Sequence, residues 1–273
     1  MVLDKFNLNK KVCIITGGAG LLGQQYANAV LQASGTPVLI DINQDSLNVV
    51  VELLLKKYGK EILAIKTDIT NKKDLEFASN RILEKYNRVD ILINNAARNP
   101  KVEGDHKKWT RFENFSDEAW SADMDVGLKG AFLCSQIFGT IMAENKSGVI
   151  LNISSDLGII APDQRIYLKN NLTEKEQMVK PVSYSVVKHG LIGLTRYLAT
   201  YWADKSVRVN AICPGGVYNN QDEEFIKKLT NLIPMGRMAE IDEYSAAVLF
   251  LISDASSYMT GSVLTIDGGR TCW

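Results

Sequence analysis

Short apolar runs alternate with helical patterns along this chain of 273 residues. The first run, residues 11–16, is rich in β-branched residues and stops at a glycine turn, and residues 21–32 then read as a helix. Further strands are predicted at 37–41, 62–67, 90–94, 148–153, 207–212 and 262–266, and further helices at 46–58, 72–86, 128–142, 184–202 and 240–252. This order predicts an α/β fold: a single-domain, doubly wound parallel sheet of about seven strands, of the Rossmann type, with helices on both faces.

Charge and cysteine content argue against several other classes of protein. The 31 Lys and Arg residues balance 31 Asp and Glu residues, so the broad positive field that binds nucleic acid or an anionic membrane is not expected. The two histidines and four cysteines have no metal-ligand spacing, and three of the cysteines lie in apolar runs that are typical of a core. The sequence shows neither a signal peptide nor a membrane span. We therefore expect a cytoplasmic protein without a metal site.

Two polar segments interrupt the alternation, at about residues 98–115 and 159–181. Each follows the carboxyl end of a predicted strand, which is the edge where open α/β sheets bind ligands. Both are therefore candidate substrate loops within one domain of residues 1–273. Surface decoration and subunit contact are the alternative roles.

A glycine-rich turn joins the first strand to the first helix. Thr16 ends the strand, and the glycines at Gly17, Gly20 and Gly23 follow it. The first permits a tight turn, the second lets a pyrophosphate approach the backbone, and the third allows close packing of helix on strand. Together with the flanking elements, this spacing predicts a dinucleotide site.

An acidic residue, Asp41, ends the second predicted strand. A carboxylate at this place accepts hydrogen bonds from both hydroxyls of the adenosine ribose, whereas it repels the 2′-phosphate of NADP. Residues 42–45 contain no Lys or Arg that could neutralise it. The sequence therefore predicts NAD as the cofactor, with NADP less favoured; a purely structural strand-end role is the alternative.

A tyrosine and a lysine four positions apart, Tyr184 and Lys188, share one face of a predicted helix. The ammonium group is expected to lower the pKa of the phenol from about 10 toward neutrality, as a general acid–base requires. Ser155 follows the strand one element upstream. These three residues are the predicted catalytic set.

The ordered motifs resemble those of the short-chain dehydrogenase/reductase family over essentially the whole chain, and the length matches its compact branch. The matching pieces are the glycine loop, Asp68-Ile69, Asn94-Asn-Ala-Ala97, Ser155, Tyr184 with Lys188, Pro214-Gly215, Thr260-Gly261 and Asp267-Gly268-Gly269. Ser155 fits better than Ser154 because it stands three residues before Gly158.

The resemblance implies a role for each matching residue. Tyr184 would be the acid–base, Lys188 would hold the nicotinamide ribose, and Ser155 would donate to the substrate oxygen. The implied cofactor-binding residues are Thr16, Gly17, Gly20, Leu21, Leu22, Gly23, Asp41, Asp68, Ile69, Asn94, Ala96, Tyr184, Lys188, Pro214, Gly215 and Val217. Asn94 could instead be a purely structural residue at a strand end. His106 and His189 are interpreted as surface or packing residues.

Three departures from the family pattern affect this interpretation. The glycine loop has the spacing of the extended, sugar-nucleotide branch. Gly127 stands where the family usually has an asparagine, so water alone or another group would connect Lys188 to solvent. The segment between Ser155 and Tyr184 is longer than usual, which predicts a more enclosed substrate pocket.

The polar residues of the two segments favour a polyol, sugar, sugar phosphate or nucleotide sugar as substrate. They include Arg98, Lys101, Asp163, Gln164, Arg165 and Asn170. Residues 155–167, 180–188 and the terminal 268–273 also resemble bacterial short-chain dehydrogenases of flagellin glycosylation and nonulosonic-acid synthesis. The predicted protein is thus an NAD-dependent oxidoreductase that interconverts an alcohol and a carbonyl. A sugar epimerase or dehydratase with retained NAD, and a cofactor-binding protein without turnover, are the alternatives. By the same resemblance we expect a homotetramer or homodimer.

Overall fold

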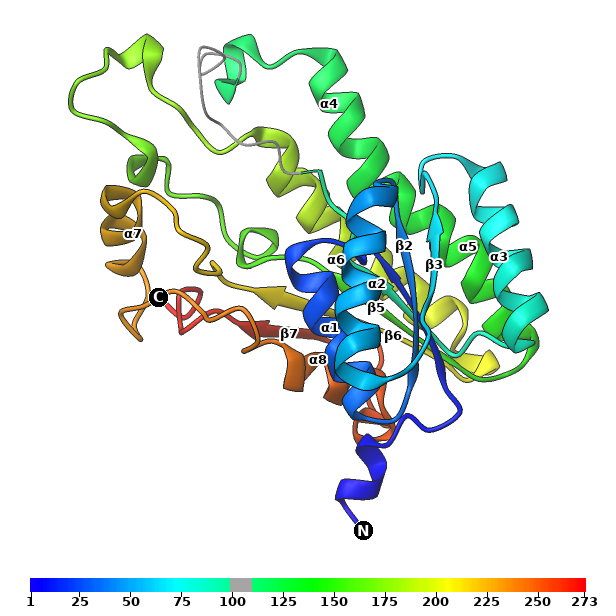
Figure 1. Ribbon diagram of the computed structural model, residues 1–273. Helices are drawn as coiled ribbons and strands as arrows, with labels where there is room; N and C mark the ends of the chain where they lie inside the picture. Colours follow the sequence, from blue (N-terminus) through cyan, green and yellow to red (C-terminus); the bar gives the residue numbers. More distant parts are fainter. Residues whose placement is uncertain (99–109) are drawn as a thin grey trace.

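Seven parallel strands form one sheet in the order β3-β2-β1-β4-β5-β6-β7 (Figure 1). The computed structural model describes residues 1–98 and 110–273. The strands are β1 (Val12–Thr16), β2 (Thr36–Asp41), β3 (Leu63–Lys66), β4 (Ile91–Asn94), β5 (Gly148–Ile153), β6 (Val207–Pro214) and β7 (Val263–Ile266). The α-helices are α1 (Leu21–Gln32), α2 (Gln44–Tyr58), α3 (Lys72–Tyr86), α4 (Asp117–Met124), α5 (Gly130–Glu144), α6 (Val182–Tyr201), α7 (Glu223–Thr230) and α8 (Ser245–Ile252). The predicted parallel, doubly wound sheet is confirmed.

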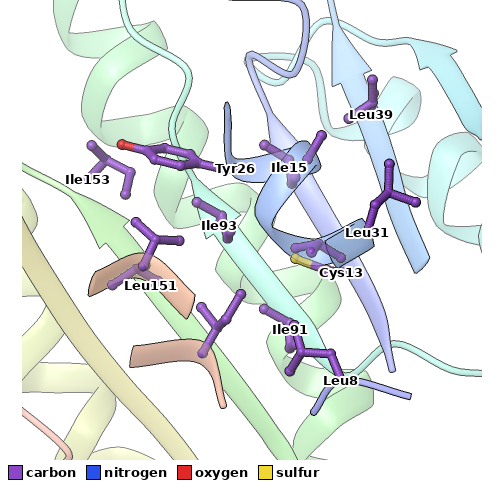
Figure 2. Close-up of a cluster of buried hydrophobic side chains, with 14 of the residues drawn as sticks. Leu8, Cys13, Ile15, Tyr26, Leu31, Leu39, Ile91, Ile93, Leu151 and Ile153 are labelled. Atoms are coloured by element: carbon purple, nitrogen blue, oxygen red, sulfur yellow. The ribbon is translucent and has the colours of Figure 1, made fainter. Parts of the chain in front are cut away.

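Helices cover both faces of the sheet because successive strand residues point to opposite sides. Cys13 and Ile15 of β1 pack with α1, α2 and α8, and Figure 2 shows this cluster around Tyr26. Val12 and Ile14 of the same strand pack on the other side with α3, α5 and α6. Every residue of β1 is buried, which explains its continuous apolar sequence.

The strand order reverses between the adjacent strands β1 and β4: β2 and β3 extend the sheet beyond β1, and β5, β6 and β7 extend it beyond β4. In open α/β sheets such a reversal leaves a crevice beyond the carboxyl ends of the two strands. A buried polar network braces this edge: Asn94 donates to Asn152 Oδ1 at 2.8 Å, and Asn152 donates to Thr195 Oγ1 at 2.8 Å. The crevice therefore has rigid walls.

Two short helices were not expected from the sequence. Helices α4 and α7 have eight residues each, and α8 begins at Ser245 rather than near residue 240. Eight residues are too few for a helix that is stable by itself, so tertiary contacts decide whether such segments are helical. The capping residues, Ser116 for α4 and Asp222 for α7, are visible signals in the sequence.

The stretch Asp117–Glu144 is long and apolar enough to cross a membrane by length and composition. It consists of α4, a π-helical turn (Asp125–Lys129) and α5, and half of its most apolar window is buried inside the fold. Helix α5 packs on the sheet through Leu133, Cys134 and Phe138. Its apolar character is therefore accounted for by the core.

The segment of residues 159–181 folds over α7 and forms a small core of its own. Ile166 packs with Leu229, Ile233 and Met238, all of them buried. Figure 1 shows α7 beside this segment, which is drawn in green. Most of the other predicted loop, with Lys101 and His106, lies outside the described residues.

The four cysteines are free, and Cys13, Cys134 and Cys213 are buried, as their apolar neighbours predicted. Cys272 is exposed.

Candidate active site

The glycine turn between β1 and α1 requires glycine at two positions. Gly17 has φ +62°, and a Cβ there would lie 2.9 Å from Ala96 Cα. A Cβ on Gly23 would lie 2.3 Å from Gly17 O. The turn therefore brings α1 tightly against the ends of β1 and β4.

A cavity of about 440 Å³ lies against this turn at the strand reversal. Its lining includes most of the cofactor-binding residues that the sequence predicted: Gly17, Gly20, Leu21, Leu22, Asp41, Asp68, Ile69, Ala96 and Val217. Asp41 Oδ2 accepts from Ala19 N at 3.1 Å, and Oδ1 accepts from Asn43 N at 3.0 Å. These bonds hold the carboxylate at the rim of the cavity.

The residues of this cavity fit a nicotinamide dinucleotide. Helix α1 has Gly20 as its N-cap, with no side-chain cap and no acidic residue in its first turn, so its amino end is open to an anionic group. The Asp41 carboxylate lies on the same cavity, where it fits ribose hydroxyls. Among the described residues, no group of three His, Cys, Asp or Glu side chains could hold a metal ion.

Seven of the predicted cofactor-binding residues do not line this cavity: Tyr184, Lys188, Pro214 and Gly215 line an adjoining cavity, and Thr16, Gly23 and Asn94 line neither. Thr16 Oγ1 accepts from Asn95 N at 3.0 Å and Ala96 N at 3.1 Å, so it joins β1 to β4. Gly23 lies behind the turn, and Asn94 points into the buried network between β4 and β5. Asn95 also lines the cavity, and its side-chain Nδ2 donates to Thr16 O and Gly17 O. This residue was not predicted from the sequence to have a role in the site.

The three predicted catalytic residues line an adjoining cavity of about 500 Å³, together with Pro214 and Gly215. Lys188 Nζ donates to Ile153 O at 2.8 Å and lies 5.7 Å from the centroid of the Tyr184 ring. Ser155 lines this cavity with Tyr184, and its hydroxyl donates to Asp156 Oδ1 at 2.7 Å. Ser154 donates instead to Lys188 O at 2.7 Å. Both serines line the cavity, and Ser155 Oγ also accepts from Leu157 N at 3.2 Å.

The expectation of a lowered pKa for Tyr184 is wrong for the protein alone. Burial raises the pKa of this phenol above its usual value, the hydrogen bond with Ser155 lowers it, and the Asp156 charge raises it further. Burial also lowers the pKa of Lys188 to about 8, and the neighbouring Lys180 charge adds to this effect. Desolvation thus outweighs the lysine charge on which the sequence argument depended.

A buried ion pair adjoins Ser155. Ser155 Oγ donates to Asp156 Oδ1 at 2.7 Å, and Arg270 Nη1 donates to Asp156 Oδ2 at 2.7 Å. The side chains of Asp156 and Arg270 are only 5% and 7% exposed. Neither residue was predicted from the sequence to have a role in the site, because they are 114 positions apart. The pair ties the carboxyl-terminal segment to the candidate site.

A second lysine, Lys180, lines the same cavity as Tyr184. Its Nζ lies 3.7 Å from the centroid of the Tyr184 ring. Burial lowers the pKa of Lys180 to about 8, while Asp156 and Asp123 oppose that shift. This lysine was not predicted from the sequence as a site residue.

The polar side chains that were expected to contact substrate lie mostly elsewhere. Arg165 pairs with Asp163 at 2.6 Å and has a side chain that is 82% exposed. Arg98 pairs with Asp123 at 2.8 Å. The lining of the cavity that contains Tyr184 includes none of Arg98, Asp163, Gln164, Arg165 and Asn170. The segment of residues 159–181 supplies Ile166, Tyr167 and Lys180 to this cavity instead.

Gly127 lies in the π-helical turn, and its surroundings exclude an asparagine. A Cβ there would lie 2.5 Å from Val187 Cγ1, next to Lys188 in the chain. Val187 thus fills the space that the family's usual side chain would need. No side chain at position 127 connects Lys188 to solvent.

Introducing the family's residue, Gly127→Asn, is expected to destabilise the protein by about 1–3 kcal/mol, because the site is already filled. Chemical denaturation measures this change. Gly193→Ala is the matched control, since a Cβ at Gly193 meets nothing within 4 Å. Adding Val187→Ala to Gly127→Asn should recover part of the loss. Wild-type stability of the single variant would contradict the packing described.

Comparison with known proteins identifies the family. A family model described as enoyl-(acyl carrier protein) reductase matches residues 18–271. The post-translational flagellin modification protein A of Campylobacter coli is 30% identical, over 96% of this chain and 98% of that protein. An NAD-dependent glycerol dehydrogenase of Listeria innocua is 32% identical, over 97% and 96%. A short-chain dehydrogenase of Leptospira borgpetersenii, solved with bound NAD⁺, has a TM-score of 0.83 and 33% identity, over 97% of this chain and 94% of that one. The chain belongs to the short-chain dehydrogenase/reductase family of oxidoreductases.

Proposed function

We propose that this protein is an NAD-dependent dehydrogenase that interconverts an alcohol and a carbonyl on a small polar substrate. One observation carries the proposal: Ser155, Tyr184 and Lys188 line one cavity, and this cavity adjoins the cavity at the strand reversal that Asp41 lines. Proton transfer and dinucleotide binding can therefore occur side by side. The bound cofactor would accept a hydride from the alcohol carbon during oxidation and return it during reduction.

Each of the three catalytic residues has a distinct task in this proposal. During oxidation, the oxygen of Tyr184 takes the proton of the substrate hydroxyl as the carbonyl forms, and in reduction it returns that proton. Ser155, whose hydroxyl donates to Asp156 Oδ1 in the protein alone, would redirect this hydrogen bond to the substrate oxygen and so orient it. Lys188, held by Ile153 O, would hold the nicotinamide ribose and present its charge to Tyr184.

Asp41 supports NAD rather than NADP. Its carboxylate is fixed by two backbone N–H groups at the rim of the cofactor cleft. A 2′-phosphate placed there would be repelled by this charge, and residues 42–45 offer no basic side chain to offset it. The related glycerol dehydrogenase is described as NAD-dependent, which agrees with this choice.

The cavity favours a hydrophilic substrate such as a sugar, a polyol or a phosphorylated sugar. Asp156, Lys180 and Arg270 are charged groups on its wall, and Asn219 and Gln221 are also present. Asp156 and Arg270 pair with each other, but a purely apolar acyl chain would leave Lys180 without a partner, which is costly. The related glycerol dehydrogenase is named for a small polyol substrate.

We further propose that the protein is cytoplasmic and forms a homodimer or homotetramer.

An assay of cofactor reduction tests the proposal. Purified protein is mixed with NAD⁺ or NADP⁺ and a panel of polyols, aldonates, sugar phosphates and nucleotide sugars, and reduced nicotinamide is followed by absorbance. We expect reduction of NAD⁺ with at least one polar alcohol, and at least tenfold lower kcat/KM with NADP⁺ because of Asp41. Retained NAD with product formed and no net change in absorbance would favour an epimerase or dehydratase. Better turnover with NADP⁺ would contradict the cofactor assignment.

A further inference from the structure

We propose that Lys180 binds an anionic group, a carboxylate or a phosphate, that the substrate carries near the carbon that reacts. The inference rests on the proposed function, because it assigns the substrate class of the same cavity. Lys180 Nζ lies 3.7 Å from the centroid of the Tyr184 ring. A group bound there would be held directly beside the catalytic phenol.

Lys180 lacks an anionic partner within the described residues. The two carboxylates whose charges act on it are already engaged by arginines: Asp156 accepts from Arg270 at 2.7 Å, and Asp123 accepts from Arg98 at 2.8 Å. None of the ion pairs among residues 1–98 and 110–273 includes Lys180. A half-buried cation without an ion-pair partner costs free energy, which an anionic ligand would recover.

The charge balance of the cavity points to the same class of ligand. Its lining has three cationic side chains, Lys180, Lys188 and Arg270, and one anionic side chain, Asp156. Arg270 is neutralised by Asp156, and Lys188 is directed to Ile153 O. Lys180 is therefore the cation of this cavity that is available to an incoming anion.

The backbone at Lys180 is fixed by a hydrogen bond and by the residue that follows it. Its backbone N–H donates to Gln164 Oε1 at 2.8 Å, and Pro181, which follows, fixes the entry into α6. The segment of residues 159–181 that carries the lysine is anchored on α7 by a buried apolar cluster. Because the backbone around Lys180 is anchored, little reorganisation of this segment is needed when an anion binds.

Calorimetric titration of the protein saturated with NADH tests the assignment without turnover. The probes are tartrate, inorganic phosphate and threitol, the last being the uncharged polyol with the carbon chain of tartrate. The variants are Lys180→Met, Lys180→Arg and the control Lys175→Met, an exposed lysine on the same segment. NADH fluorescence and thermal unfolding show that each variant folds.

We expect wild-type protein to bind tartrate or phosphate at least tenfold more tightly than threitol, as a charge-assisted hydrogen bond implies. Tighter tartrate binding indicates a carboxylate, and tighter phosphate binding indicates a phosphate. Lys180→Met should lose this preference, whereas Lys180→Arg and Lys175→Met should keep it. No preference in the wild type, or an unchanged preference in Lys180→Met, would overturn the inference. An absence of NAD⁺ reduction with every substrate would instead count against the dehydrogenase function, independently of these titrations.

Discussion

Replacing Tyr184 by phenylalanine is expected to reduce turnover by about 10²–10⁴-fold, the usual contribution of a general acid–base. The change removes one hydroxyl from a ring that is held at the cavity by α6, so the ring should keep its place. Binding of NADH should change little, because Tyr184 is not among the residues that line the cavity at the strand reversal with Asp41. Steady-state kinetics and NADH fluorescence give the two readouts.

The pH dependence distinguishes the two directions of this reaction. Oxidation requires the phenolate of Tyr184, and reduction requires the phenol. Because burial raises the pKa of Tyr184, the phenol predominates at neutral pH. The kcat/KM for alcohol oxidation should therefore rise as the pH increases above neutrality, while that for carbonyl reduction should fall. Unchanged turnover in Tyr184→Phe, with correct folding, would exclude the assigned acid–base role.

The order of strands and helices was predictable from the sequence because the buried strands are mostly apolar. In β1 every residue is buried, Val12 to Ile15 pack alternately against the helices on the two faces, and the glycine turn marks the end of the strand. The short helices α4 and α7 were not predictable, because eight residues form a helix only with tertiary support. Periodicity thus identified the long elements and missed those that depend on contacts distant in the chain.

The candidate site was predictable only as far as local spacing reaches. The four-residue interval between Tyr184 and Lys188 and the glycines of the turn lie within single elements, so their proximity follows from helix and turn geometry. The partnership of Asp156 and Arg270 crosses 114 positions and has no local signature. The raised pKa of Tyr184 likewise depends on burial by several separate segments. Such properties require the tertiary arrangement.

The Asp156–Arg270 pair provides the second large expected effect. Arg270→Met should lower the free energy of unfolding by about 3–5 kcal/mol, because it leaves the buried Asp156 carboxylate uncompensated. Thermal and denaturant unfolding measure the loss. Arg165→Met is the control: Arg165 also pairs with an aspartate, but its side chain is 82% exposed, so a change below about 1 kcal/mol is expected.

A double variant separates the charge from the geometry of this pair. Adding Asp156→Asn to Arg270→Met removes the uncompensated charge and should restore most of the stability. Turnover of the double variant should stay below that of the wild type, since Ser155 donates to the Asp156 carboxylate at 2.7 Å and its hydroxyl would lose that charged acceptor. Recovery of both stability and kcat would show that the pair serves folding alone. Recovery of stability without kcat would identify Asp156 as the residue that positions the catalytic serine, with Arg270 holding Asp156 in place.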